Sequence, residues 1–359
     1  MAKGPTVYDV AERAGVSIAT VSFTFRQPEK VKASTRELVL AAAEALGYVP
    51  SASARGLARG RTGALGLFAY DYLLDPAKGE GGVSGSPAAE GPDNEDLRLF
   101  PLYVDEVQRG VELECWRRGQ ALLVGGGNPE NNEAVLSDIA GRVDGLAVFP
   151  RSVPSSTLAR IARRIPVVEV SESALNPELD HVTVDNASGI RAVTEHLVTV
   201  HGMERLIFLG GVPSSDNDER MQAFLATLAD AGIEPAGKPA YPCGGEDAVA
   251  KAIRDTCTGD QIPEAIVCAT DQDALVVLDT LASIGVSVPG EVAVTGFDGI
   301  AAGRVARPSL TTVRQPMELM GRTMVRLLME RLDDPEKRPT AVSLPVHLVV
   351  RESCGCQGG

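Results

Sequence analysis

The stretch 7–25, VYDVAERAGVSIATVSFTF, limits the fold of the amino-terminal part of the chain more than any other stretch. Thr6 and Asp9 have the T-x-x-D spacing of a capping box, which marks the start of a helix. Gly15 is expected to end that helix, because glycine adopts a positive φ without steric cost. Ser17 is placed to cap a second helix. Two short helices joined by a glycine-containing turn predict a helix-turn-helix.

A third helix is predicted after this pair. Ser34 and Glu37 repeat the capping-box spacing, and Gly47 stops the run. The apolar residues at helical spacing between them are Leu38, Ala42, Ala45 and Leu46. The segment 51–60, SASARGLARG, then has small residues with two arginines and one leucine. One interpretation is that the three small helices are merely an α-helical lobe and that residues 51–60 are a linker. The distribution of charge argues against this interpretation.

Charge divides the chain into two unlike parts. Residues 1–60 contain eight Lys and Arg against five Asp and Glu, a net charge of +3, whereas the whole chain carries −14, which leaves −17 for residues 61–359. A basic module on a strongly acidic body is typical of nucleic-acid binding by the module, because the body would be repelled by phosphates.

Length and composition set further bounds. A chain of 359 residues with 44% hydrophobic residues can bury a large core and has room for two to three domains. No 18-residue apolar run is present and no apolar segment follows the first residues, so neither a membrane span nor a secretory signal is expected. The six cysteines have no regular disulfide spacing, which favours free thiols and a cytoplasmic protein.

From residue 62 onward, short apolar runs alternate with helical stretches. Such alternation predicts parallel sheets built from βαβ units. Two consecutive series indicate an α/β fold with two doubly wound lobes and a ligand cleft between them. The expected strands are 65–70, 121–124, 145–149, 167–170 and 181–184, then 205–209, 265–269 and 291–295.

The segment 71–100 interrupts this alternation. Gly, Pro and acidic residues dominate it, and it cannot bury enough surface to order itself. A lid over the cleft is one interpretation; a tolerated disordered insertion is favoured over it.

Matching segments along nearly the whole chain resemble the lactose/galactose repressor (LacI/GalR) family. They are, in order, DVAERAGVSIATVS, TRELVLAAAEALGY, SARGLARGRTGALGL, VDGLAVFP, VTVDNASGIRAVTEHL, ERMQAF, VPGEVAVTGFDGI and PSLTTVRQP. The resemblance implies an all-α helix-turn-helix head and two lobes of periplasmic-binding-protein type. The implied divisions are a DNA-binding domain 1–50, a hinge 51–61, and an effector-binding and dimerisation domain 62–359, with lobe 1 at about 62–185 and 314–342 and lobe 2 at about 186–313 and 343–359.

By this resemblance the second helix lies in the major groove of DNA. The positions that would read bases hold Ile18, Ala19 and Phe23. None of them can hydrogen-bond to a base, so apolar contact with thymine methyl groups is the direct readout left to them. A core role for Phe23 is the alternative. The residues expected to contact DNA otherwise, mostly its phosphates, are Thr6, Ser17, Thr20, Ser22 and Arg26.

The segment 51–59 resembles the family's hinge, which folds into a short helix on DNA. In that likeness Leu57 would wedge into a central minor-groove base step, with Arg55 near a phosphate. Two hinges are needed, which implies a homodimer on a near-palindromic operator. The ending RESCGCQGG has no heptads and favours a dimer over a tetramer.

In the body, the family's ligand positions match Arg220 and Asp298, which could together clamp vicinal hydroxyls. Asp271 is a third candidate, Glu172 stands where a basic or aromatic residue is frequent, and Tyr103 lies near the family's aromatic pair. A pocket more acidic than usual implies a neutral, hydroxyl-rich or cationic effector, such as a sugar, and not a phosphorylated one. The alternatives are that Arg220 is an ordinary arginine at the start of a helix, paired with Glu219 or Asp218, and that Asp298 only caps a loop.

Other sequence features give weaker evidence about function. The glycines at 125–127 lack G-x-G-x-x-G spacing, which argues against a dinucleotide cofactor. The histidines at 181, 196, 201 and 347 are too dispersed to predict a metal site. Cys354 and Cys356 could chelate metal or sense redox state, but a flexible reduced tail is the favoured interpretation. No catalytic constellation stands out, so no enzyme, cofactor or metal is expected.

The sequence therefore predicts a transcriptional regulator, most simply a repressor, whose operator affinity depends on a small polar effector. A solute-binding protein and an α/β enzyme with the same two-lobed body are the alternatives, and the helix-turn-helix argues against both. The effector, the operator, and whether the effector releases or recruits the protein are open at this point.

Overall fold

The computed structural model describes residues 4–49, 61–70, 103–127, 131–149, 153–171, 176–210, 214–238, 240, 242, 245–257 and 262–357. They form two compact units. The first unit is Met1–Ala64 with Arg142–Asp144, and its helical part is called the head below. The second unit, called the body, contains Leu65–Gly141 and Gly145–Gly359. The segments 50–60 and 71–102 lie outside the described residues.

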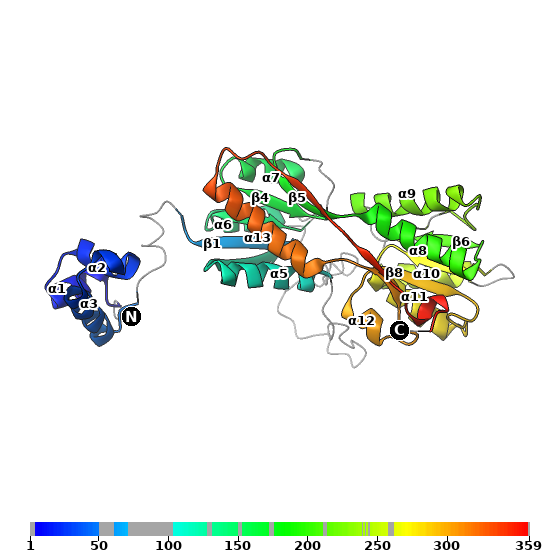
Figure 1. The fold of residues 1–359 in the computed structure, drawn as a ribbon, viewed down its shortest axis with the longest axis horizontal. Coiled ribbons are helices and arrows are strands. Elements are labelled where there is room, and N and C mark those ends of the chain that lie inside the picture. Colours follow the sequence, from blue (N-terminus) through cyan, green and yellow to red (C-terminus); the bar gives the residue numbers. More distant parts are fainter. Residues whose placement is uncertain are drawn as a thin grey trace. The chain divides into compact units, whose positions relative to one another are not determined.

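The described residues of the head form three α-helices, α1 (Val7–Ala14), α2 (Ile18–Arg26) and α3 (Ala33–Leu46), with a 3₁₀ turn η1 (Pro28–Lys30) before α3 (Figure 1). The predicted capping box is present, since Thr6 N donates to Asp9 Oδ2 (2.6 Å) and Asp9 N donates to Thr6 Oγ1 (3.4 Å). Gly15 has φ of 63° and ends α1. The helices share a small core of Val10, Ala11, Val21, Val39, Ala42 and Ala43. The predicted helix-turn-helix is therefore confirmed.

The start and the buried face of α3 differ from prediction. The helix begins at Ala33, after Lys32, and no side chain caps it, so the capping box expected at Ser34 and Glu37 was wrong. Leu38 is 59% exposed, and its neighbour Val39 is buried instead. Residues 38–40 are apolar in succession, so local spacing alone could not select the buried one. Packing against α1 and α2 makes that choice.

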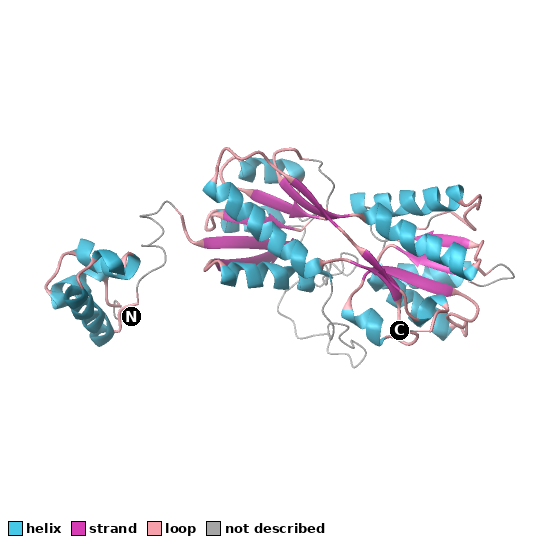
Figure 2. Ribbon diagram, in the orientation of Figure 1, coloured by secondary structure: helices cyan, strands magenta, loops and turns pink. Residues whose placement is uncertain are grey.

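The body contains two sheets (Figure 2). In the six-stranded sheet the strand order is β10-β5-β4-β3-β1-β2, and in the five-stranded sheet it is β11-β9-β8-β7-β6. Pairing is parallel from β1 through β3, β4 and β5 to β10, and from β6 through β7 and β8 to β9, whereas β11 runs antiparallel to β9. The bounds are β1 (Ala64–Tyr70), β2 (Ala121–Gly127), β3 (Gly145–Val148), β4 (Val167–Val170), β5 (Asp180–Val184), β10 (Ala341–Leu344), β6 (Leu206–Leu209), β7 (Ala265–Cys268), β8 (Ala293–Asp298), β9 (Thr311–Arg314) and β11 (His347–Val349).

Helices cover both sheets, as the central strands β3, β4, β6, β7 and β8 require because they are buried on both faces. The helices of the six-stranded sheet are α5 (Tyr103–Arg117), α6 (Asn132–Ala140), α7 (Ser155–Ala162) and α13 (Met317–Asp333). Those of the five-stranded sheet are α8 (Asn186–His201), α9 (Ser215–Asp230), α10 (Gly245–Thr256), α11 (Asp271–Ser283), α12 (Ala301–Val305) and the 3₁₀ turn η4 (Glu352–Cys354). Each sheet with its helices is one lobe, numbered 1 and 2 in this order (Figure 1).

The chain passes between the lobes three times, after β5, after β9 and after β10. The second passage returns α13 to lobe 1, where it packs along α5 and against β3, β4 and β5. Gly110 and Gly321 let the two helix backbones touch, because a Cβ at either position would overlap backbone atoms of the other helix. The α/β fold with two doubly wound lobes is confirmed. No helix among the described residues is long and apolar enough to cross a membrane.

Candidate functional site

The exposed face of α2 is the candidate DNA-contacting surface of the head. Ser17 Oγ accepts a hydrogen bond from Thr20 N (3.1 Å) and lies 2.9 Å from Thr20 Oγ1, which starts the helix at Ile18. Ile18 and Phe23 are 42% and 44% exposed, and Ala19 is exposed beside them. Phe23 is therefore not a core residue of the head, and α2 presents an apolar outer face. Such a face suits the methyl groups of thymine.

The polar residues of the head that were predicted to contact DNA differ in their structural environments. The Thr6 hydroxyl donates to Asp9 Oδ2 (2.7 Å) and so belongs to the cap of α1. Ser17 and Thr20 stand at the start of α2, where the helix dipole favours an anion such as phosphate. Ser22 is half-buried on α2. The side chain of Arg26, and Arg55 and Leu57 altogether, lie outside the described residues.

In the body, Arg220 is the centre of the candidate effector site. Ser214 caps α9, which begins at Ser215 and carries Arg220 on its inner face. The side chain is only 4% exposed. Arg220 Nε donates to Asn186 Oδ1 (2.8 Å), and Nη1 donates to the carbonyl of Ala269 (2.8 Å). The guanidinium also lies 3.8 Å from the ring centroid of Phe297, a cation–π contact. Arg220 is thus held rigidly by α8, β7 and β8.

Asp298 ends β8 close to this arginine and is 5% exposed. Its Oδ1 accepts a hydrogen bond from Gln315 Nε2 (2.7 Å). Its φ is 126°, a strained value for a residue with a side chain, as found at functional sites. Burial raises the pKa of Asp298 to about 8, against the opposing charge of Arg220. The carboxyl is therefore largely protonated near neutral pH and can both donate and accept.

Further carboxylates surround Arg220. Asn186 Nδ2 donates to Asp216 Oδ1 (2.9 Å) and to Glu219 Oε2 (3.1 Å). Asp216 Oδ2 lies 3.9 Å from Arg220 Nη2, and burial raises the pKa of Asp216. Asn186 thus brings the carboxylates of Asp216 and Glu219 to the same network as Arg220. The alternative pairing of Arg220 with Glu219 or Asp218 is replaced by this network.

The carboxylate of Asp271 is hydrogen-bonded to other residues of lobe 2. Its Oδ2 accepts hydrogen bonds from the backbone N–H groups of Gly299 (2.7 Å) and Ile300 (2.8 Å). Its Oδ1 accepts one from Thr312 Oγ1 (2.5 Å). Burial raises the pKa of Asp271 to about 6. Since both oxygens are used by chain donors, Asp271 fixes the loop that follows Asp298.

Lobe 1 contributes Tyr103, the first residue of α5. Its hydroxyl is hydrogen-bonded to Ser171 Oγ, and its ring meets Phe149 edge-on with centroids 6.3 Å apart. Burial raises the pKa of Tyr103, and the negative charges of Asp216 and Asp298 raise it further. The phenol therefore lies in the same region as the lobe 2 carboxylates. Glu172, one residue beyond Ser171, is outside the described residues.

Several residues of this region were missed in the sequence. They are Phe149, Ser171, Asn186, Asp216, Phe297 and Gln315. Phe149 ends a predicted strand and Ser171 directly follows one, where ligands of parallel sheets bind, and that position is the signal that could have identified these two. Ser171 also has a positive φ, 56°.

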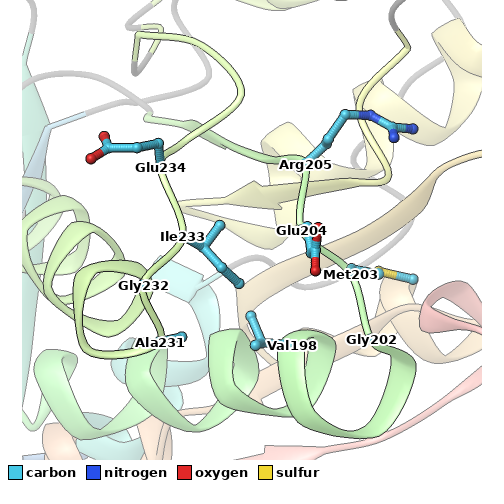
Figure 3. Close-up of a pocket in the computed structure, with 9 residues that line it drawn as sticks. All are labelled: Val198, Gly202, Met203, Glu204, Arg205, Ala231, Gly232, Ile233 and Glu234. Carbon is cyan, nitrogen blue, oxygen red and sulfur yellow. The ribbon is translucent and has the colours of Figure 1, made fainter.

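A separate pocket of about 540 Å³ lies in lobe 2 and is shown in Figure 3. Val198 and Ile233 face one another across it. Its lining comes from the carboxyl-terminal ends of α8 and α9 and from residues just before β6: Val198, Gly202, Met203, Glu204, Arg205, Ala231, Gly232, Ile233 and Glu234. It therefore opens at the amino end of β6, whereas Arg220 and Asp298 lie at the carboxyl ends of the strands. The pocket is not part of the candidate effector site.

One group of potential metal ligands occurs among the described residues. His196 and His201 of α8 lie together with Cys354 and Cys356. The spacing of the histidines in the sequence did not predict that His196 and His201 lie beside these cysteines. Cys354 is fully buried, so at this point the carboxyl-terminal tail is packed and not flexible as expected.

Comparison with known proteins identifies both parts of the chain. Residues 6–51 match the family of bacterial regulatory proteins named lacI, and residues 194–354 match the periplasmic binding protein-like domain. The HTH-type transcriptional repressor PurR of Photobacterium profundum is 30% identical over 97% of this chain and 98% of its own. The protein of the same name from Escherichia coli O1:K1 / APEC is 28% identical over 97% and 96%.

Solved structures agree with this assignment. A transcriptional regulator CelR–cellobiose complex is 29% identical, with a TM-score of 0.67 over 97% of this chain and 99% of that chain. The lac repressor dimer bound to operator and the anti-inducer ONPF shares the fold, at 24% identity and a TM-score of 0.79 over 98% and 99% of the two chains. The chain therefore belongs to the lacI family of bacterial regulatory proteins.

Proposed function

We propose that this protein is a transcriptional repressor whose affinity for operator DNA is controlled by a small, hydroxyl-rich effector bound by residues of both lobes. The observation that carries the proposal is the buried Arg220 network beside Asp298, in a body attached to a helix-turn-helix head. Membership of a family of DNA-binding regulators supports the absence of turnover, so we expect no enzymatic activity. Because its proposed target is genomic DNA, we expect the protein in the cytoplasm.

The head would bind with α2 in the major groove. Ile18, Ala19 and Phe23 offer methyl and ring surface to thymine methyl groups, and they offer no hydrogen bond to a base. Ser17 and Thr20, at the amino end of the helix, would bind phosphate. Readout by apolar contact alone is weak, so we expect specificity to depend strongly on the hinge, where Leu57 would wedge into a central base step with Arg55 at a phosphate. This requires a homodimer on a near-palindromic site.

The chemical class of the effector is inferred from the charges and the hydrogen-bond donors around Arg220. Arg220 Nη2 lies 3.9 Å from Asp216 Oδ2, beyond hydrogen-bond distance, and is the guanidinium nitrogen best placed to donate to a ligand. Asp298, Asp216 and Tyr103 add acceptors and hydroxyls around it. The carboxylates of Asp216 and Glu219 repel a phosphate, and the whole group suits vicinal hydroxyls or a cation. The cellobiose named with the CelR structure, at 29% identity, supports a sugar.

Control of DNA binding would follow from a population shift. Tyr103 and Ser171 belong to lobe 1, whereas Arg220 and Asp298 belong to lobe 2. A ligand that touches both sets binds more tightly to the arrangement of lobes that brings them together. Operator affinity then changes by the ligand's differential affinity for the two arrangements.

Selection from random duplexes at moderate salt, followed by sequencing, tests the DNA-binding part. We expect enrichment of a near-palindrome with a flexible pyrimidine–purine step at its centre. Salt-sensitive binding without any enriched sequence, with and without cell extract as a source of effector, would contradict specific recognition.

The selected duplex then serves as a fluorescent probe for effectors. Neutral mono- and disaccharides, polyols, amines and sugar phosphates are titrated into the complex. We expect a neutral or cationic compound to change operator affinity and sugar phosphates to have no effect. Arg220→Met is the matched variant, which should keep operator binding and lose the response. A response that Arg220→Met retains would place the effector elsewhere.

A further inference from the structure

The carboxyl-terminal tail brings two cysteines against two histidines of α8. His201 is the last residue of α8, and His196 stands five residues before it. Cys354 ends η4, and Cys356 follows after Gly355. All four cysteine and histidine side chains offer a ligand atom within 4.8 Å of the others. None of them belongs to the candidate effector site.

The ligand atoms of these four residues lie 3.3–3.6 Å apart in the pairs that follow. His196 Nε2 and His201 Nε2 are 3.3 Å apart. His196 Nε2 lies 3.5 Å from Cys354 Sγ and 3.6 Å from Cys356 Sγ. His201 Nε2 lies 3.4 Å from Cys356 Sγ. The two imidazoles are nearly perpendicular, at 78° with centroids 5.0 Å apart, so they meet edge to face and do not stack.

A tetrahedral zinc ion fits these distances. With zinc–nitrogen bonds of about 2.0–2.1 Å and zinc–sulfur bonds of about 2.3 Å, the edges of a tetrahedron are about 3.3–3.4 Å between nitrogens and about 3.6 Å between nitrogen and sulfur. The four distances above lie close to these values. Without an ion, the Cys354 thiol can donate to the carbonyl of Arg351, 3.3 Å away.

We propose that His196, His201, Cys354 and Cys356 bind one zinc ion in a closed structural site. Two imidazoles and two thiolates are a typical ligand set for zinc and a poor one for magnesium or calcium. Four protein ligands leave no open position for a substrate, so the ion is structural. The proposal is independent of the proposed function.

The cysteines are held in place by contacts other than the ion. Ser353 Oγ donates to the carbonyl of Val294 (2.6 Å) and accepts from Thr311 N (2.8 Å), which fastens η4 to β8 and β9. Glu352 Oε2 accepts from Ser309 N and Ser309 Oγ, both at 2.8 Å. The site is therefore largely preformed, which lowers the cost of binding.

Gly355 lets both sulfurs turn to the same side. Its φ is 102°, a value that a residue with a side chain rarely adopts. A Cβ at this position would also lie 3.4 Å from His201 Cε1. The backbone conformation therefore favours glycine between the two cysteines, whereas the nearby imidazole would leave ordinary contact distance for a Cβ.

The site is remote from the effector residues. Ser353 contacts Val294 near the start of β8, whereas Asp298 ends that strand. Along α8, Asn186 and His201 stand at opposite ends of 16 residues, about 22 Å at about 1.5 Å per residue. Zinc would therefore tie the tail to α8 and stabilise lobe 2 without contacting the effector.

The test uses the full chain without a histidine tag, purified under reducing conditions. We expect about one zinc per chain by elemental analysis, as for a site with four protein ligands. A chelator should remove it and lower the melting temperature. Cobalt should then restore stability and produce the absorption of a tetrahedral thiolate complex, which an octahedral surface site does not give.

Variants locate the ion. Cys356→Ser and His196→Gln should each lose most of the zinc and the cobalt absorption. His347→Gln changes an exposed histidine and should keep both. If a variant fails to fold, the chelator and cobalt measurements on the native chain still decide. No uptake of zinc or cobalt by the reduced native chain would overturn the proposal, as would metal retained by both variants. A mass lower by two hydrogens, from a Cys354–Cys356 disulfide that forms under reducing conditions, would overturn it as well.

Discussion

Replacing Asp298 with asparagine should make the body less sensitive to rising pH. In the native chain burial raises the pKa of Asp298 to about 8, whereas an unfolded chain has an aspartate pKa of about 3.9. Between these values the folded state holds a proton that the unfolded state has released. The free energy of unfolding therefore falls as the pH rises through this window and levels off above about pH 8. Asparagine has no proton to lose, and its oxygen can still accept from Gln315 Nε2.

The magnitude follows from the pH dependence of one proton. A full proton difference changes the unfolding free energy by about 1.4 kcal/mol per pH unit, or about 2.7 kcal/mol between about pH 6 and pH 8. Entry of water and the nearby guanidinium of Arg220 lessen the difference. We therefore expect the stability of Asp298→Asn relative to the native chain to increase by roughly 1–3 kcal/mol over this range.

Urea unfolding of the effector-free chain, followed by circular dichroism at both pH values, measures this difference. Asp279→Asn makes the same substitution at an exposed position of α11 and should show no comparable change. A relative stability of Asp298→Asn that stays constant or decreases from pH 6 to pH 8 would refute the buried, protonated Asp298 described above.

Other substitutions test other parts of the molecule. Asp271→Ala should destabilise the body by roughly 3–5 kcal/mol in urea unfolding, because two N–H groups and one hydroxyl lose their acceptor; a loss below about 1 kcal/mol would contradict its anchoring role. Ser17→Ala should cost the head about 1 kcal/mol through the lost helix cap, seen as a lower melting temperature of the head. Phe23→Ala should weaken operator binding about tenfold while changing stability by less than about 0.5 kcal/mol, since the side chain is half exposed; unchanged affinity in anisotropy titrations would remove it from the readout. Leu57→Ala should weaken operator binding much more than binding to random DNA, and equal losses in a gel-shift titration would disprove the wedge.

The head shows how far local reasoning reaches. The caps at Thr6 and Ser17 and the turn at Gly15 depend on contacts between residues three or four apart, so their spacing was sufficient to predict them. In α3 the same reasoning failed twice, because the spacing of Ser34 and Glu37 forms no cap and the buried residue is Val39 in place of Leu38. Leu38, Val39 and Leu40 are equally apolar, and packing against two other helices selects Val39 for the core.

The effector site shows a different limit. Arg220 and Asp298 were found by family resemblance, and the structure gives their surroundings. Asn186 and Gln315 belong to segments at which the chain enters or leaves lobe 2, and no local pattern distinguishes them. Asp271 was predicted to contact the effector, yet the hydrogen bonds that occupy its oxygens come from residues 28, 29 and 41 positions away.

The sequence by itself determined the helix-turn-helix, the alternation of strands and helices, and the division of charge between head and body. Each depends on short-range periodicity or on composition, which folding does not change. Only the tertiary structure decided which buried carboxyl remains protonated and which one anchors a loop, because burial and partners set both. It also decided the metal-ligand group, since His196 and Cys354 are 158 residues apart and meet only when η4 is fastened to the strands beside α8.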